Sequence, residues 1–208
     1  VTGYPSEPIL TRDFFISSIS VVDSIIRNYT ANRHNYSAGI NVTAGGSVID
    51  RCVFTNNVSG RESYDDVTRS MGVRIDQKYT PETVIRNSLF ANNRGVWTGV
   101  PTNGSNSTNV CAGAVYTAGN TLIENCTIAN NSTYQSTARR TAGITVVGSG
   151  VEIVNTISWG TAVTNKDEQV ENVVDLYVLD GVECDVRNCC MSGLESGIGN
   201  VATNPKFH

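Results

Sequence analysis

Two polar segments of the chain hold residue types that could act on an acidic sugar. Asp65 and Asp66 are adjacent in "SGRESYDDVTRS", and Arg139 and Arg140 are adjacent in "QSTARRTAG". Carboxylates can bind a divalent cation or share in glycoside hydrolysis, and arginines can hold an acidic group. Neighbouring residues on an extended chain point apart, however, so we interpret these segments, and the acidic "NKDEQVEN" at 165–172, as solvated loops.

The histidines and tryptophans add one further candidate. His34 lies in a polar segment and His208 is the last residue, so neither is placed as a general base. Trp97 lies in "RGVWTGVPTNGSNSTN", whose composition predicts an exposed insertion where an indole ring can stack on a sugar. Trp159 ends the strand-like "NTISWG", and we expect it to pack under a loop. We find no Ser-His-Asp or Cys-His arrangement.

Acceptor triplets for N-linked glycosylation are frequent. They begin at nine positions: Asn28, Asn35, Asn41, Asn57, Asn103, Asn106, Asn125, Asn130 and Asn131. This excess over chance favours a secreted or cell-surface glycoprotein, although an Asn-rich repeat also creates such triplets by itself.

The whole chain sets further bounds. Its 208 residues suit one domain with a full core. A net charge of −4 argues against nucleic acid as a partner, and no apolar run approaches the roughly 20 residues of a membrane span. The chain begins at Val1 without a charged and apolar leader, so we expect a mature or excised segment whose targeting signal is missing.

One short motif recurs along the chain. It places an apolar residue two positions before Asn, then a small residue and another apolar one. The copies are "IDRCVF" at 49–54, "IRNSLF" at 85–90, "IENCTI" at 123–128, "IVNTIS" at 153–158 and "VRNCCM" at 186–191, and "IRNY" at 26–29 fits as an imperfect first copy.

A second motif alternates with the first. Its copies are "SAGINV" at 37–42, "SMGVRI" at 70–75, "CAGAVY" at 111–116 and "TAGITV" at 141–146, with "VVDLYV" at 173–178 and "ESGIGN" at 195–200 as weaker members. Two short alternating strands in each period, with no helical periodicity, predict an all-β solenoid in which each coil pairs with the next.

Stacking explains the other residues of the first motif. The residue before Asn should point outward and form one column, namely Arg27, Asp50, Arg86, Glu124, Val154 and Arg187. Charges alternate along this column wherever they occur, as cross-strand pairing favours. Asn tolerates the left-handed backbone of a sharp corner, and its amide can bond to the next coil. We expect the pairs Asn56-Asn57, Asn92-Asn93 and Asn130-Asn131 to turn a second corner in the same way.

The six cysteines give no metal site, because they do not form CxxC pairs with nearby histidines. Cys52, Cys126 and Cys189 share the small inward position about 9.6 Å apart, two coils at 4.8 Å each, which is too far for a disulfide. A bridge from Cys184 to Cys190, or from Cys111 to a loop partner, remains open.

These motifs resemble those of the right-handed parallel β-helix superfamily, the pectate-lyase-like fold. "FTNN" at 54–57, "FANN" at 90–93 and "GAV" at 113–115 are similar to the repeats of polymorphic outer-membrane adhesins. "VNTISWG" at 154–160 and "GNVATNPKF" at 199–207 are similar to the final coils of secreted bacterial β-helix proteins, in which a closing segment normally follows. Members of the superfamily that cleave polysaccharides use clustered carboxylates with Ca²⁺ beside a basic residue, or paired Asp residues.

We therefore expect a single right-handed parallel β-helix of about six coils, with a strand or cap segment at 1–20, coils at 21–207 and long loop insertions. The expected function is a non-enzymatic structural or adhesive module, secreted or at the cell surface, which binds glycans or other surface ligands. The apolar "PILTRDFFISSIS" at 8–20 suits a coil end, so copies are expected to stack end to end in a fibre. The alternatives are a lyase or glycoside hydrolase using Asp65, Asp66, Arg139 and Arg140, the only case that implies Ca²⁺, and a carbohydrate-binding module using Trp97.

Overall fold

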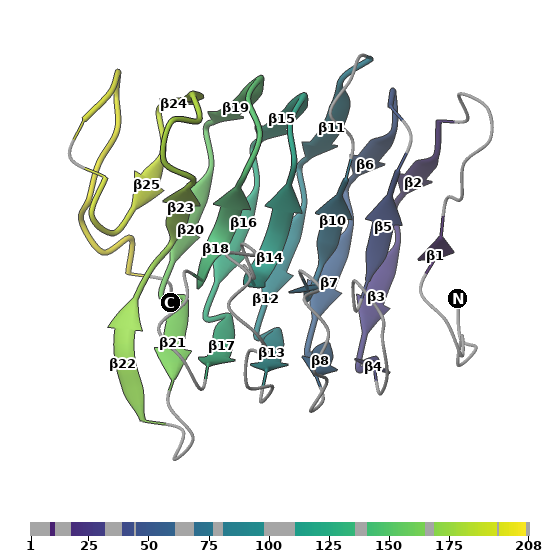
Figure 1. The fold of residues 1–208 in the computed structure, drawn as a ribbon, viewed down its shortest axis with the longest axis horizontal. Helices are drawn as coiled ribbons and strands as arrows, with labels where there is room; N and C mark the ends of the chain where they lie inside the picture. Colours follow the sequence, from purple (N-terminus) through teal and green to yellow (C-terminus); the bar gives the residue numbers. More distant parts are fainter. Residues whose placement is uncertain are drawn as a thin grey trace, which may run out of the picture.

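The computed structural model describes residues 9–10, 18–31, 39–43, 45–60, 69–76, 81–97, 111–135, 141–164, 169–194 and 196–206. All regular structure in these residues is β-strand, and they hold no helix that could cross a membrane. The strands form four sheets, which we call A to D (Figure 1).

Each sheet is a ladder of short strands from distant parts of the chain. Sheet A runs β1 (Ile9–Leu10), β5 (Ile40–Val42), β10 (Val73–Ile75), β14 (Cys111–Thr117), β18 (Thr141–Val146) and β23 (Leu176–Val178), with β9 (Arg69–Ser70) also paired to β14. Sheet B runs β2 (Ser20–Val22), β6 (Val48–Asp50), β11 (Thr83–Arg86), β15 (Thr121–Glu124), β19 (Val151–Val154) and β24 (Cys184–Arg187).

The other two sheets follow the same order. Sheet C runs β3 (Ile25–Arg27), β7 (Val53–Thr55), β12 (Leu89–Ala91), β16 (Thr127–Ala129), β20 (Ile157–Trp159) and β25 (Cys190–Met191). Sheet D runs β4 (Thr30–Ala31), β8 (Val58–Gly60), β13 (Arg94–Trp97), β17 (Ser132–Gln135), β21 (Ala162–Thr164) and β22 (Val170–Val173). Within the described residues the strand pairs are parallel, except that β21 pairs with β22 in antiparallel orientation.

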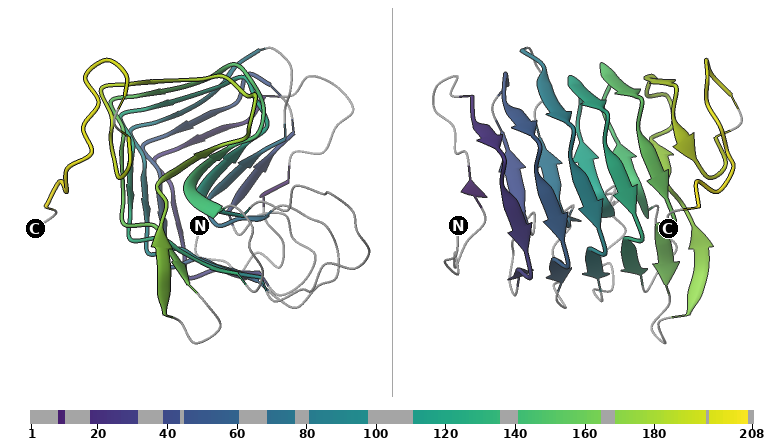
Figure 2. Two further views of the ribbon diagram at one scale, coloured as in Figure 1. Left: turned by 60° about the vertical axis from the view of Figure 1, so that its left-hand side comes forward. Right: turned by 180° about the vertical axis from the view of Figure 1, so that it is seen from behind.

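The chain visits sheets A, B, C and D in turn and then returns to A; we call each such circuit a pass. Successive passes lie side by side along the long axis, and Figure 2 shows the sheets surrounding a common interior. An all-β chain with stacked parallel sheets is consistent with the expected parallel β-helix.

The interior is filled by every second residue of the strands, as the alternation predicts. Fully buried side chains from successive passes stack on one another, and the rings of Phe54 and Phe90 lie parallel with centroids 4.6 Å apart. The small residues Cys52, Ser88 and Cys126 are buried beside them at the corner between sheets B and C. The largest of the wholly enclosed residues are Phe54, Phe90, Ile40, Ile49, Met71, Ile75, Ile85, Ile123, Ile128, Ile144, Ile153 and Met191.

The corner between sheets B and C has two residues in every pass, and the first has a left-handed backbone. Asn87, Asn125, Asn155 and Asn188 take φ of 49–53° there, as the Asn of the first motif predicts. Asp23 and Arg51 hold the same place in the first two passes, each with φ of 51°. In the first pass Val22, not Arg27, therefore pairs with Asp50. The predicted column is wrong at that position, because Asn28 turns the following corner and Arg27 pairs with Thr55.

The corner between sheets C and D divides its work between two asparagines. Asn28, Asn56, Asn92 and Asn130 take the left-handed conformation, with φ of 53–56°. After Asn56, Asn92 and Asn130 the next residue is a buried asparagine, and these three form a ladder in which the amide Nδ2 of Asn57 donates to Oδ1 of Asn93, and Nδ2 of Asn93 donates to Oδ1 of Asn131, at 3.0 and 2.9 Å. Each ladder oxygen also accepts the backbone N–H of the preceding pass.

The second motif also has a steric basis. A Cβ atom on Gly72 would lie 2.6 Å from the backbone oxygen of Ala114 and 2.6 Å from the ring of Phe90, so only glycine fits where the chain enters sheet A. "VVDLYV" supplies β23 of this sheet, as expected. The assignment of "ESGIGN" to the same motif is wrong, because Ile198 and its neighbours lie against the corner between sheets B and C.

Replacement of Asn92 and of Asn93 by glycine should change the unfolding free energy by very different amounts. Asn93→Gly removes the acceptor of two Asn57 donors and the donor to the Phe54 carbonyl, so we expect a loss of roughly 3–5 kcal/mol of unfolding free energy. Asn92→Gly keeps the left-handed backbone and should change it by about 1 kcal/mol or less. Urea denaturation followed by circular dichroism measures both, and equal losses would contradict the division of roles.

Candidate functional site

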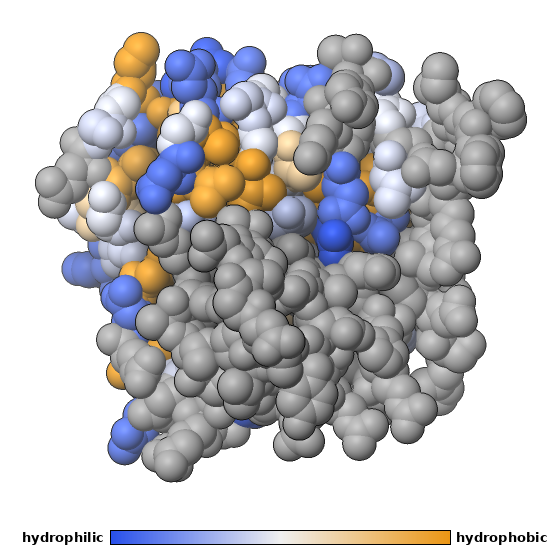
Figure 3. Space-filling model, viewed as in Figure 1, coloured by the Kyte–Doolittle hydropathy of each residue, from blue (hydrophilic) through white to orange (hydrophobic). Residues whose placement is uncertain are grey.

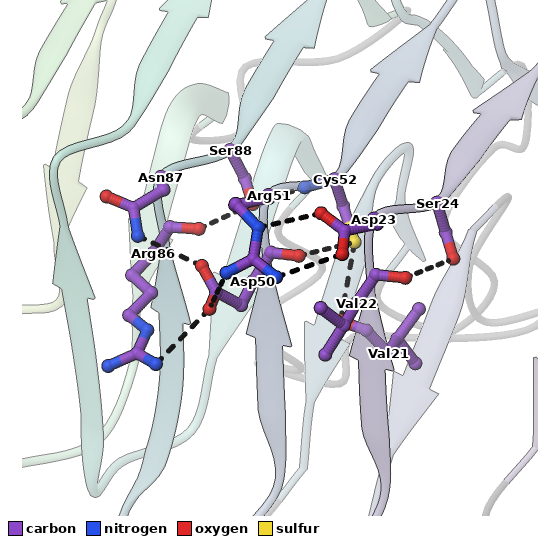
Figure 4. A network of polar contacts seen from close by, with 10 residues as sticks. All are labelled: Val21, Val22, Asp23, Ser24, Asp50, Arg51, Cys52, Arg86, Asn87 and Ser88. Carbon is purple, nitrogen blue, oxygen red and sulfur yellow. Dashed lines mark hydrogen bonds and ion pairs between the residues drawn. The ribbon is translucent and has the colours of Figure 1, made fainter.

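The most connected polar cluster of the described residues lies on the corner between sheets B and C in the first passes (Figure 4). Arg51 binds both oxygens of Asp23 at 2.7 and 2.9 Å and an oxygen of Asp50 at 2.8 Å. Asp50 also accepts from Arg86 at 3.2 Å and from the amide of Asn87 at 2.9 Å. We call these five residues the corner network.

Asp50 is the centre of the corner network. Its side chain is 5% exposed, whereas those of Asp23, Arg51 and Arg86 are 66%, 54% and 43% exposed. The hydrogen bond from Asn87, with the Arg86 and Arg51 cations, lowers the pKa of Asp50 against the opposing effect of burial. The hydrogen bond to Arg51 likewise lowers the pKa of Asp23.

The corner network is therefore built for structure. Two carboxylates face two guanidinium groups, and the one buried carboxylate is already saturated with donors. A general acid needs a raised pKa, whereas that of Asp50 is lowered, and both Asp50 oxygens already accept hydrogen bonds within the protein. Its pairing with Arg86 confirms this part of the predicted charge column.

A second polar surface covers the outer side of sheet A. Arg74 pairs with Tyr116 in register, its guanidinium lies 5.5 Å from the centre of the Tyr116 ring, and its Nε donates to Asp76 at 2.7 Å. The Arg74 side chain is only 12% exposed. Tyr177 faces outward on the same sheet two passes further along. Arg74 and Tyr116 occupy outward positions in the motif copies "GVRI" and "AVYT". This pair was not identified from the sequence, because the prediction was based on the inward-facing residues of the motif.

Most of the residues predicted for chemistry fall in the chain segments that connect sheet D to sheet A. Asp65 and Asp66 lie outside the described residues, in the connection from β8 of sheet D to β9 of sheet A, and Arg139 and Arg140 lie in that from β17 to β18. Trp97 is the last residue of β13, paired through its backbone with Gln135; its side chain lies outside the description. The ends of these connections lie on the same edge of neighbouring passes.

The glycosylation candidates separate by burial. Asn57 and Asn131 are 0% and 1% exposed with their amides in the ladder, so the packed structure has no room for a glycan there. Asn41 is 6% exposed on the outer side of sheet A. Asn28, Asn125 and Asn130 are exposed at corners, and modification at these three stays a prediction. Asn35, Asn103 and Asn106 lie outside the described residues.

The bridge between Cys184 and Cys190, one of the two left open by the sequence, is not formed. Both are free thiols, as are Cys52, Cys126 and Cys189, because Cys184 lies on sheet B and Cys190 on sheet C with a corner between them. Burial raises the pKa of Cys126 and that of Cys184 to about 12, so neither is a nucleophile at neutral pH. The side chain of Cys111 lies outside the description.

Among the residues described here no group of three or more His, Cys, Asp or Glu side chains could hold a metal ion. The buried Asp175 is occupied by protein donors, namely the backbone N–H of Thr161 and both the N–H and hydroxyl of Ser192, at 2.6–3.0 Å. It thereby continues the role of the asparagine ladder at the end of sheet D. No protein-family model, no curated protein and no solved structure matches this chain.

The corner network predicts a pH dependence. A lowered folded-state pKa stabilises the fold above the ordinary value near 4 and ceases to do so as the pH falls through the folded value. Asp50→Asn should therefore lower the urea midpoint at pH 7, and the difference from the parent should close as the pH falls through the lowered folded-state pKa of Asp50. Glu183→Gln, an exposed surface control, should leave both midpoints unchanged. A deficit that persists unchanged in acid would contradict the ionic role.

The cysteines give a chemical test. At pH 8 without denaturant we expect a maleimide to leave Cys52, Cys126 and Cys189 unmodified, because all three are 2% exposed or less. In urea, without reductant, at least five thiols should react. Mass spectrometry of tryptic peptides assigns the sites, and a recovered peptide linking Cys184 to Cys190 would contradict the structure.

Proposed function

We propose that this chain is a right-handed parallel β-helix of about six coils that acts outside the cell as a non-enzymatic scaffold, adhesive or structural. One observation carries this proposal. The connections from sheet B to C, and from C to D where both strands are present, have two residues, whereas those from A to B have three to nine and those from D to A span 32–39, 61–68, 98–110 and 136–140. Length variation thus lies at the two edges of sheet A, and the longest of these connections, 98–110, enters it from sheet D.

Such a frame suits display. Repeated stacking gives a stiff support, and connections that enter at successive passes are spaced about 4.8 Å apart along it. Binding residues are commonly carried on loops held by a rigid scaffold. The displayed connections would contact glycans or other cell-surface ligands, and the acceptor triplets support a secreted, glycosylated protein.

The strands themselves support a non-enzymatic role. Within the described residues the arginines Arg51, Arg74, Arg86 and Arg187 are all ion-paired, and Asp50 and Asp175 are saturated with donors. These side chains stabilise the stack and hold no poised acid, base or nucleophile.

A sugar-binding module is the second candidate, favoured by the outer side of sheet A. Arg74 and Tyr116 lie next to each other on the outer side of sheet A, and guanidinium and phenol groups suit acidic and neutral sugars respectively. A lyase or hydrolase would further require Asp65, Asp66, Arg139 and Arg140 to converge there, with Ca²⁺ in the lyase case.

An activity assay tests the enzyme alternative. The purified chain, incubated with acidic plant and animal polysaccharides with and without Ca²⁺, should yield no unsaturated or newly reducing product. A product that disappears in the double variant Arg139→Ala, Arg140→Ala would overturn the scaffold proposal and establish the enzyme.

Display itself is tested by shortening one connection. Replacing residues 99–109 with a short Gly-Ser turn should leave the circular dichroism spectrum and the urea midpoint nearly unchanged, because loop length has a small effect on stability. Binding to a glycan array and to cultured cells should fall at least about tenfold if this connection carries a contact. Binding that survives shortening of this connection, and likewise of 61–68 and 136–140, would contradict display.

A further inference from the structure

Exposed apolar side chains gather at the two ends of the stack. Val22 and Ile25, on the first pass, are 37% and 58% exposed, and Ile198 and Val201, after the last strand, are 76% and 49% exposed. Figure 1 shows β2 and β3 at one end and the yellow C-terminal segment at the other. Figure 3 shows, for comparison, a face on which apolar patches are interrupted by polar residues. Each end of the stack therefore carries one pair of exposed apolar residues, Val22 with Ile25 at the first pass and Ile198 with Val201 after the last strand.

Neighbouring passes meet at the corner between sheets B and C by a fixed set of bonds. The N–H of Arg51 and the hydroxyl of Ser88 both donate to the carbonyl of Arg86, at 3.2 and 2.7 Å. The N–H of Cys52 donates to the hydroxyl of Ser88, and the N–H of Leu89 donates to the carbonyl of Cys52. We call this set the corner bonds; Asn125 and Cys126 repeat it with the next pass.

The segment Ile198–Val201 makes the corner bonds again, as a seventh, partial pass. The N–H of Asn188 donates to the carbonyl of Ile198, and the N–H of Cys189 donates to the side-chain oxygen of Asn200. The N–H of Val201 donates to the carbonyl of Cys189. Gly199 has φ of 69° and occupies the left-handed corner position. The segment therefore presents a finished corner on its outer side.

The first pass presents the matching half of the same set. The hydroxyl of Ser24 donates to the carbonyl of Val22 at 2.9 Å, as Ser88 does to Arg86, so its lone pairs can still accept a bond. The N–H of Ile25 points to the open edge, because alternate residues of β3 bond to β7. Gly199 and Asn200 have N–H groups without a partner within the described residues.

We infer that two copies of this chain stack head to tail, with the first pass of one copy seated on Ile198–Val201 of the other. The N–H of Gly199 then donates to the carbonyl of Val22, that of Asn200 to the Ser24 hydroxyl, and that of Ile25 to the Asn200 carbonyl. These are the corner bonds once more.

The side chains agree with this register. Ile198 extends the column of Arg187 and would lie beside Val22 of the second copy, and Val201 extends the column of Cys190 and would lie beside Ile25. All four of these exposed apolar residues are thereby covered in two apolar pairs. Because the contact joins two different surfaces, each added copy exposes the same end again, and the product is an open filament.

A charge exchange tests this contact. Sedimentation velocity of the parent chain over a rising concentration series should show growing oligomers. Ile25→Lys alone and Val201→Asp alone should each weaken association at least roughly tenfold, because an unpaired charge loses its water in the contact. An equal mixture of the two variants should recover assembly, since lysine from one copy then meets aspartate from the other.

Controls keep the outcome unambiguous. Thr127→Lys and Thr127→Asp place the same charges in the same outer column of sheet C at mid-stack, and both should assemble like the parent. Far-ultraviolet circular dichroism checks folding, and Ile198→Asp replaces Val201→Asp if that variant is unfolded. A parent chain that remains monomeric, or variants that assemble singly or fail to recover when mixed, would overturn the head-to-tail contact.

This inference rests on the scaffold function and adds its partner, a second copy of the same chain. The head-to-tail contact and the scaffold function can be tested independently. Ligand binding by the D to A connections is measured on the monomeric variants, so a monomeric parent chain that still binds cells would overturn only the contact.

Discussion

The structure depends on the backbone at its corners. A two-residue corner can redirect a strand from one sheet to the next only if one residue takes positive φ, and this is costly for most side chains but mild for asparagine. Because both corners have the same length in every pass, the inward face of each strand meets the inward face of its neighbours. A slip of one residue would turn the core outward, so the corners and the core fix the same register.

Asparagine serves the two corners in different ways. On the corner between sheets B and C it is useful for its backbone, and the small residue after it fills the interior. On the corner between sheets C and D the first asparagine bends the chain, and the second satisfies buried backbone donors that a turn would otherwise leave without partners. Where asparagine is absent, at Asp23 and Arg51, a side-chain ion pair accompanies the strained backbone and joins the first two passes.

Much of this architecture could be predicted from the sequence, because alternation and corner chemistry are local properties. Ile85, Ser88 and Phe90 are buried as expected, and Asn87 and Asn92 have the expected conformation. The first pass was placed wrongly because "VVDS" lacks the asparagine that identifies the other copies. The cysteine pairing failed for a different reason, since spacing along the chain does not reveal that residues 184 and 190 lie on different sheets. The surface around Arg74 and Tyr116 could not be predicted from the sequence, because packing of the core does not restrict which residues occupy outward positions.

Because stacking assigns a structural role to most side chains of the strands and corners, it limits which residues can carry an activity. Inward positions are taken up by the core, corner positions by backbone geometry, and many outward charges by pairs within or between passes. What remains free to vary are the connections that lead into and out of sheet A, and within the described residues the first and last passes each have a neighbouring pass on one side only. A frame of this kind can gain a ligand by changing a connection without altering its register. It can extend into a filament only if its two ends are complementary. The hydrogen bonds that join neighbouring passes within one chain can also join the last pass of one chain to the first pass of another. Recognition and assembly are therefore separable in this fold, and substitutions that change one need not disturb the other.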